Sequence, residues 1–283
     1  MELWYSLVDL LPFDWAQPGS MFFMKNALLA VLVISPLFGL LSTMVVHSRM
    51  SFFSDALGHS AFTGMAIGAL CGLAEPVGAA VVFAVVIALL FTLIRQKTHM
   101  ASDTAISVFS SAAVALGIFL STLGGQSFTK FNNLLIGDIL SVAPGEIGLL
   151  ALILLGVVIL WVTSFNPMML SSVHQALADS RGIKVFWQET VFSMAIAVVV
   201  TVSMTWVGLL VINSLLVLPA AAARNLAKNS AAYHGFSVII SLVSGLSGLI
   251  LSYYWGIATG GTIVLMAAVI FFGTFLFARL KRG

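Results

Sequence analysis

The chain has 283 residues, of which 60% are hydrophobic and only 8% are charged. An ordinary soluble protein carries about 25% charged residues, so this composition excludes a water-soluble fold. It equally excludes a disordered chain, because disordered chains are poor in apolar residues. The mean hydropathy of +1.12 indicates an integral membrane protein, and the net charge of +2 favours no class of partner by itself. The single cysteine, Cys71, rules out an intrachain disulfide or a cysteine-based metal cluster.

The N-terminal segment, residues 1–25, is predicted to be a short tail outside the cytoplasm. It contains Glu2, Asp9 and Asp14 and has no basic residue before Lys25. A secretory signal peptide begins with positive charge, so this segment does not fit one.

The rest of the chain consists largely of apolar runs with the length of membrane spans, for which about 20 residues are needed. The runs are continuous rather than alternating, which favours helices over a β-barrel. We therefore predict an all-α membrane bundle of eight or nine transmembrane helices, forming a single domain over residues 1–283. The predicted spans are 26–46, 55–74, 77–94, 104–123, 146–164, 190–207, 209–223, 235–254 and 259–278.

Two stretches depart from the regular pattern of spans. Residues 131–145 are too short to cross and are predicted to form a re-entrant or broken element. Residues 190–223 must cross twice, which requires a tight turn near Trp206–Gly208 and a short second limb that Pro219 should kink. Short and interrupted segments of this kind often line the substrate paths of transporters.

The basic residues set the predicted orientation. Lys25 and Lys130 fall on one side of the membrane, and the ten others fall on the opposite side, which the positive-inside rule makes cytoplasmic. The N-terminus is then outside and the C-terminus inside, so the number of crossings must be odd. The ten are Arg49, Arg95, Lys97, Arg181, Lys184, Arg224, Lys228, Arg279, Lys281 and Arg282.

Asp55 and His59 are the main candidates for chemistry inside the membrane. They are four residues apart, so a helix places both on one face, and His59 should lie roughly 15 Å from the cytoplasmic end of its span. Ionisable groups in a span cost about 2.5–3.5 kcal/mol each on insertion scales, which suggests a function. A carboxylate and an imidazole form half of a typical transition-metal site. The alternative is a hydrogen bond between the two that only stabilises the bundle.

Asp138 and Asn213 are weaker candidates on the same path. Each can supply a further oxygen ligand or act at a gate. The alternative for Asp138 is a helix cap that faces the outside water, and for Asn213 it is a hydrogen bond between helices. The other histidines lie at span ends or in cytoplasmic loops, where we do not expect ligands.

Missing motifs exclude several functions. The sequence has no G-x-x-x-x-G-K-[ST] phosphate loop, so the chain is not expected to hydrolyse ATP itself. It has no basic patch with interleaved aromatic residues, which excludes nucleic acid as a partner. An intramembrane enzyme using His59 and Ser60 is disfavoured because Phe62 stands where a G-x-S-x-G motif needs glycine. An ion-coupled secondary transporter with Asp55 and His59 as a proton relay remains an alternative.

The longest polar cytoplasmic stretch, residues 165–189, is predicted to be a loop between two spans. Its middle, HQALADSRGI, is predicted to form a short helix that ends at Gly182. Such a helix suits docking by a soluble partner, although an ordinary surface loop is equally compatible with the sequence.

Four stretches, in order along the chain, resemble permease subunits of bacterial zinc and manganese importers of the ATP-binding-cassette class. RMSFFSDALGHSAFTGMAIG at 49–68 is similar to a signature of these subunits. LLIGDIL at 134–140, ALADSRGI at 176–183 and VGLLVINSLLVLPAAAARNLA at 207–227 agree with three further ones. The sequence departs from the pattern at Ser54, where many relatives have glycine, and at Asn213, where the pattern allows small or polar residues.

The resemblance implies a membrane subunit that works as a homodimer, on which two cytoplasmic ATP-binding subunits dock. A metal-binding protein outside the cytoplasm would deliver the ion, and the chain would span the bacterial cytoplasmic membrane. Asp55, His59 and Asp138 would then lie on the metal path.

The resemblance also assigns a cytoplasmic segment to ATPase coupling, comprising Ala176, Asp179, Arg181, Gly182 and Ile183. No permanently bound cofactor is expected. The transported ion would be Zn²⁺, Mn²⁺ or Fe²⁺, with zinc preferred slightly because it suits a nitrogen ligand better than manganese does.

Overall fold

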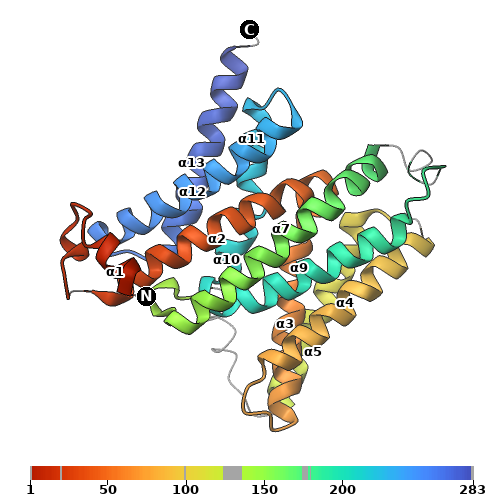
Figure 1. The fold of residues 1–283 in the computed structure, drawn as a ribbon. Coiled ribbons are helices and arrows are strands. Elements are labelled where there is room, and N and C mark those ends of the chain that lie inside the picture. The colour runs from red at the N-terminus through yellow and green to blue at the C-terminus, as the bar shows by residue number, and fades with distance from the viewer. Residues whose placement is uncertain are drawn as a thin grey trace.

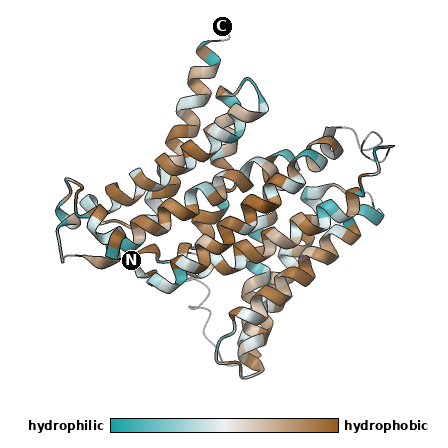
Figure 2. Cartoon of the chain, viewed as in Figure 1, coloured by the Kyte–Doolittle hydropathy of each residue, from teal (hydrophilic) through white to brown (hydrophobic). Residues whose placement is uncertain are grey.

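The computed structural model describes residues 2–19, 21–98, 100–123, 136–173, 178 and 180–281. Throughout these residues the regular elements are helices (Figure 1), which confirms the predicted all-α bundle. Apolar side chains dominate the long helices, and polar residues gather at the helix ends and in the loops (Figure 2). The elements are α1 (Glu2–Val8), η1 (Asp14–Ala16), α2 (Phe22–His47), α3 (Phe53–Leu70), α4 (Val77–Thr98), α5 (Ser102–Leu123), η2 (Ile139–Ser141), α7 (Pro144–Val173), α9 (Val185–Val207), α10 (Leu209–Leu215), α11 (Leu218–Leu226), α12 (Ser230–Trp255) and α13 (Thr259–Leu280).

Eight helical stretches in the described part of the chain are long and apolar enough to cross a membrane. They are α2, α4, α5, α7, α9, the α10–α11 pair, α12 and α13. Of the described helices with 18 or more residues, α3 lies outside this set, because its 18 residues include Asp55, His59 and several small polar residues that lower its hydropathy. It packs between α4 and α5 and against α9, and its length of about 27 Å is sufficient for a crossing.

The helices around the predicted cytoplasmic loop are longer than expected. We predicted a loop over 165–189, but α7 continues to Val173 and α9 already begins at Val185. Met168, Met169 and Leu170 favour helix in their own right, and Pro167 is accommodated inside α7. The connection between the two helices is therefore residues 174–184.

The N-terminal tail is folded against α2 rather than extended. Trp15 is fully buried, and the Tyr5 hydroxyl donates to Asn26 Oδ1 over 2.9 Å. Lys25 lies inside α2 instead of in a loop, and its side chain is completely buried. The ammonium pairs with Asp9 and donates to the carbonyl of Gln17 over 3.0 Å.

The region expected to cross twice contains both features predicted for it. Gly208 joins α9 directly to α10 with a φ of +85°, and a Cβ there would lie 2.2 Å from the carbonyl oxygen of Ile136, so only glycine fits this turn. The returning limb breaks at Leu216–Val217, and Pro219 stands in the first turn of α11. Proline suits that position because the first amides of a helix have no acceptor within it.

The described part of the predicted re-entrant element does not cross the bundle. Residues 131–135 lie outside the described residues, and residues 136–143 contain only the short η2 before α7 begins. The amide of Asp138 donates to the carbonyl of Trp206 over 3.0 Å, which fastens this segment to the α9–α10 turn.

Candidate functional site

Asp55 and His59 are brought together in the first three turns of α3. Helical spacing places Nε2 of His59 3.3 Å from Oδ2 of Asp55, in agreement with the shared face predicted from the sequence. The other carboxylate oxygen, Oδ1, accepts a hydrogen bond of 3.1 Å from Nδ2 of Asn213 in α10. The structure therefore unites three of the four predicted metal-path residues.

A glycine makes this approach of α10 to α3 feasible. Gly58 lies between Asp55 and His59 in the sequence, and a Cβ added there would come within 2.4 Å of the side chain of Leu209. Leu209 is the first residue of α10. The absence of a side chain at Gly58 lets α10 lie close enough for Asn213 to reach Asp55.

The cluster is partly exposed in the single chain. The side chain of Asp55 is 44% exposed and that of His59 is 19% exposed. Oδ1 of Asn213 is buried and has no hydrogen-bond partner among the described residues. The site thus combines a carboxylate, an imidazole and an amide oxygen at the edge of the chain.

This donor set suits a divalent cation that is bound in passing. Carboxylate and amide oxygens are hard ligands and imidazole nitrogen is a borderline one, a mixture that accepts zinc and manganese alike. Within the described ranges, no group of three or more His, Cys, Asp or Glu side chains converges. A four- to six-coordinate ion at Asp55 and His59 would complete its shell with water or with ligands from another chain.

Asp138 lies apart from this cluster. It precedes η2, and its Oδ1 accepts the amide of Leu140 over 3.1 Å, so it caps that short helix and is exposed. It lines a separate cavity of about 220 Å³ with Val211 and Gly260, among others, in which neither Asp55 nor His59 takes part. The geometry corresponds to the alternative stated for Asp138, a capping residue, and its part in a metal path remains a prediction.

The predicted coupling segment is described only in part, because Ala176 and Asp179 lie outside the described residues. Its end matches the sequence prediction. Gly182 has a φ of +74°, and the amide of Ile183 donates to the carbonyl of Ala178 over 3.1 Å, as expected where glycine terminates a helix. Arg181 is exposed at this end. Its role in coupling remains a prediction.

An ion pair that the sequence analysis missed joins α4 to α9. Nη2 of Arg95 lies 2.5 Å from Oε1 of Glu189, and Nε2 of Gln96 donates to the other carboxylate oxygen over 3.1 Å. Both charged side chains are mostly buried, with 17% and 23% exposed. Glu189 was assigned to the end of a loop, and no sequence signal connects it with Arg95 because the two are far apart in the chain.

Comparison with known proteins agrees with the resemblance seen in the sequence. A model described as the ABC 3 transport family matches residues 20–278. The chain is 29% identical over 261 residues to the manganese transport system membrane protein MntC of Listeria monocytogenes, covering 92% of each chain. It is 30% identical over 248 residues to the high-affinity zinc uptake system membrane protein ZnuB of Haemophilus influenzae, covering 87% of this chain and 94% of the relative.

A solved structure has the same fold. The chain superimposes on PsaBC from Streptococcus pneumoniae, solved in complex with Fab, with a TM-score of 0.76 and 27% identity. The match covers 97% of this chain and 95% of that one, so the fold is shared over nearly the whole length of both chains.

Proposed function

The chain belongs to the ABC 3 transport family, and we propose that it carries manganese or zinc ions into the cell across a bacterial cytoplasmic membrane. It is the membrane permease subunit of an ATP-binding-cassette importer of divalent metal ions and not an enzyme. ATP hydrolysis belongs to a separate subunit, in keeping with the lack of a phosphate loop in this sequence.

The observation that carries the proposal is the cluster of Asp55, His59 and Asn213. A half-exposed carboxylate on a spanning helix is costly if it faces lipid, whereas it is expected in a passage for cations. The ion must exchange part of its water shell for protein ligands and must also leave them again. A small donor set from one chain meets both requirements, because it recognises the cation without enclosing it.

The exposure of Asp55 supports one part of the assembly proposed around this chain, the second copy of the permease. A second copy, placed against the open side of α3, covers Asp55 and adds its own ligands to the passage. Two cytoplasmic ATP-binding subunits dock near residues 174–184, and a metal-binding protein delivers the ion from outside. Direction comes from rearrangement of the dimer when ATP is bound and hydrolysed.

The proposed orientation places the N-terminus outside and the C-terminus in the cytoplasm. Counting α3 with the eight apolar spans gives nine crossings, the odd number that this orientation requires. The coupling segment, Arg224 and Arg279 are then all cytoplasmic, as the positive-inside rule requires.

The proposed cargo is limited to manganese and zinc. The relatives described above are named for these two metals, and the iron considered from ligand chemistry alone is not carried forward. Asp55 and His59 accept either ion, so the choice between them rests on a direct measurement.

The decisive experiment measures ATP-dependent uptake of Mn²⁺ and Zn²⁺ by vesicles that contain the chain with its ATPase. Asp55→Ala and His59→Ala should abolish uptake while co-purification with the ATPase persists. Ser60→Ala is the matched control, because the Ser60 hydroxyl donates to the carbonyl of Ala56 in its own helix over 2.7 Å. Normal uptake by both variants, or uptake driven by a proton gradient without ATP, would contradict the proposal.

A further inference from the structure

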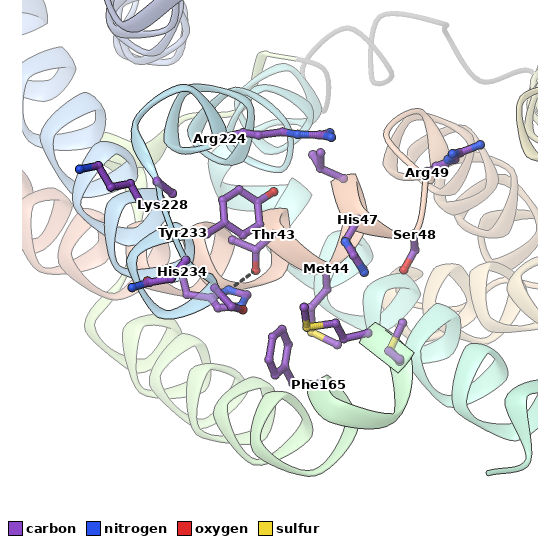
Figure 3. A pocket seen from close by; sticks show the side chains of 16 residues that line it. Thr43, Met44, His47, Ser48, Arg49, Phe165, Arg224, Lys228, Tyr233 and His234 are labelled. Atoms are coloured by element: carbon purple, nitrogen blue, oxygen red, sulfur yellow. Dashed lines mark hydrogen bonds between the residues drawn. The ribbon is translucent and has the colours of Figure 1, made fainter. Parts of the chain in front are cut away.

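A second, larger cavity lies between the predicted cytoplasmic ends of α2 and α7 and the junction of α11 with α12. Its volume is about 500 Å³. Figure 3 shows Arg224 and Lys228 on one side of it and Arg49 on the other. It shares no lining residue with the Asp55–His59 cluster or with the cavity beside Asp138.

The charged side chains that line this cavity in the described part of the chain are all basic. They are Arg49, Arg224 and Lys228, and no described aspartate or glutamate is among the lining residues. The three cations are exposed, and none forms an ion pair with another residue in the described part of the chain. Such a surface attracts an anion and repels a divalent metal ion. The cavity is therefore distinct from the proposed metal path.

Part of the cavity wall is apolar. Met44 and Phe165 contribute to it from within spanning helices. His234, which we had placed at a span end, is 92% buried against the ring of Phe165, with centroids 4.5 Å apart. Its Nδ1 lies 2.8 Å from the Thr43 hydroxyl, as the dashed line in Figure 3 shows. That hydroxyl donates to the Leu40 carbonyl over 2.7 Å, so Nδ1 is the donor to Thr43.

We propose that this cavity binds the phosphoryl head group of an anionic phospholipid from the cytoplasmic leaflet. Cations at the boundary hold the phosphate by charge-assisted hydrogen bonds, and the wall with Met44 and Phe165 receives the first carbons of an acyl chain. A contact for the ATPase would need cations but not an apolar wall continuous with the spanning helices. The inference rests on the proposed function in one respect, which is that the proposed orientation makes this leaflet the cytoplasmic one.

The test uses the permease–ATPase complex purified from membranes that contain phosphatidylglycerol, with bound lipid counted by native mass spectrometry. Arg224→Gln combined with Lys228→Gln should lower retained phosphatidylglycerol several-fold. Arg279→Gln with Lys281→Gln makes the same charge change at the exposed end of α13 and should retain the wild-type amount. Arg224→Lys with Lys228→Arg keeps the charge and should also retain the lipid, so loss in the Gln pair is then assigned to the missing charge and not to substitution at these positions.

Three results would overturn the proposal. One is equal lipid retention by the Gln pair and by wild type. Another is displacement of the bound species by millimolar inorganic phosphate, which would identify a soluble anion. The last is loss of the ATPase from the Gln pair with lipid retention unchanged, which would identify a protein contact. Lipid retention is measured without transport, so its failure is distinguishable from failure of the metal-uptake experiment.

Discussion

The side-chain amide of Asn213 donates a hydrogen bond to Oδ1 of Asp55 over 3.1 Å, across 158 positions of the chain. His59 lies 3.3 Å from the other oxygen of the same carboxylate. The carboxylate is thus held from both sides, by its own helix and by α10. Its orientation depends on the contact between these two helices.

Replacing Asn213 with Ala should slow metal uptake about tenfold. A hydrogen bond to a charged group contributes about 1.5–3 kcal/mol, and its loss frees the Asp55 carboxylate to rotate away from the ion. Uptake by vesicles at a series of metal concentrations measures the effect. Ser214→Ala changes the adjacent residue of α10, whose hydroxyl has no hydrogen-bond partner among the described residues, and should transport normally. Equal rates for Asn213→Ala and wild type would show that the amide has no part in the path.

Replacing Glu189 with Gln should separate ATP hydrolysis from transport. The Arg95–Glu189 pair joins α4 to the second turn of α9, close after the proposed coupling segment, and α4 packs on α3 with Asp55 and His59. Uptake per ATP hydrolysed should fall several-fold. The variant should also lose stability, because Arg95 is left mostly buried without its counter-ion. Exchanging the charges, Arg95→Glu with Glu189→Arg, should restore part of the ratio.

The matched control is Glu75→Gln, which removes a carboxylate exposed in the α3–α4 turn and should leave the ratio unchanged. An unaltered uptake-to-hydrolysis ratio in Glu189→Gln would mean that the ion pair only stabilises the bundle.

Reversing the charge of Arg181 should weaken docking of the ATPase. Arg181 is exposed beside Gly182, whose φ is positive, and the coupling contact is proposed at this point of the chain. Arg181→Glu should reduce the ATPase recovered with the purified permease several-fold. Arg279→Glu, a reversal elsewhere on the proposed cytoplasmic side, should not; unchanged recovery with Arg181→Glu would remove this residue from the contact.

Adding a methyl group at Gly64 should destabilise the packing of α3 on α4. A Cβ there would lie 2.6 Å from Cα of Ala80 and 2.8 Å from the carbonyl oxygen of Ala79, both backbone atoms that cannot move aside. Overpacking of this kind costs about 1–3 kcal/mol, and Gly64→Ala should lower the melting temperature in detergent. Gly156→Ala in α7, where no atom lies within 4 Å of the added carbon, should not lower it. A Gly64→Ala protein that melts like wild type would show that α3 and α4 are not packed this closely.

The sequence was sufficient for features that depend on local chemistry. Hydropathy located the spans, helical spacing placed Asp55 and His59 on one face, and Gly208 and Gly182 marked a turn and a helix end that need a positive φ. These signals are carried by residues that are close in the chain, and the structure confirms each of them.

Contacts between distant segments were not predictable in the same way. The pairing of Arg95 with Glu189 and the burial of His234 against Thr43 and Phe165 depend on how helices pack. The length of α7 was missed for a different reason. Polar residues were taken as the end of helix, whereas they mark only the end of its apolar part.

The buried ammonium of Lys25 has a consequence for biosynthesis. Its counter-ion, Asp9, precedes the first long helix instead of lying within it. During translation Asp9 therefore emerges before Lys25, the charge that it neutralises. When α2 reaches the insertion machinery, the counter-ion of its lysine has already been synthesised. A shortened N-terminus would deliver an uncompensated cation to that step.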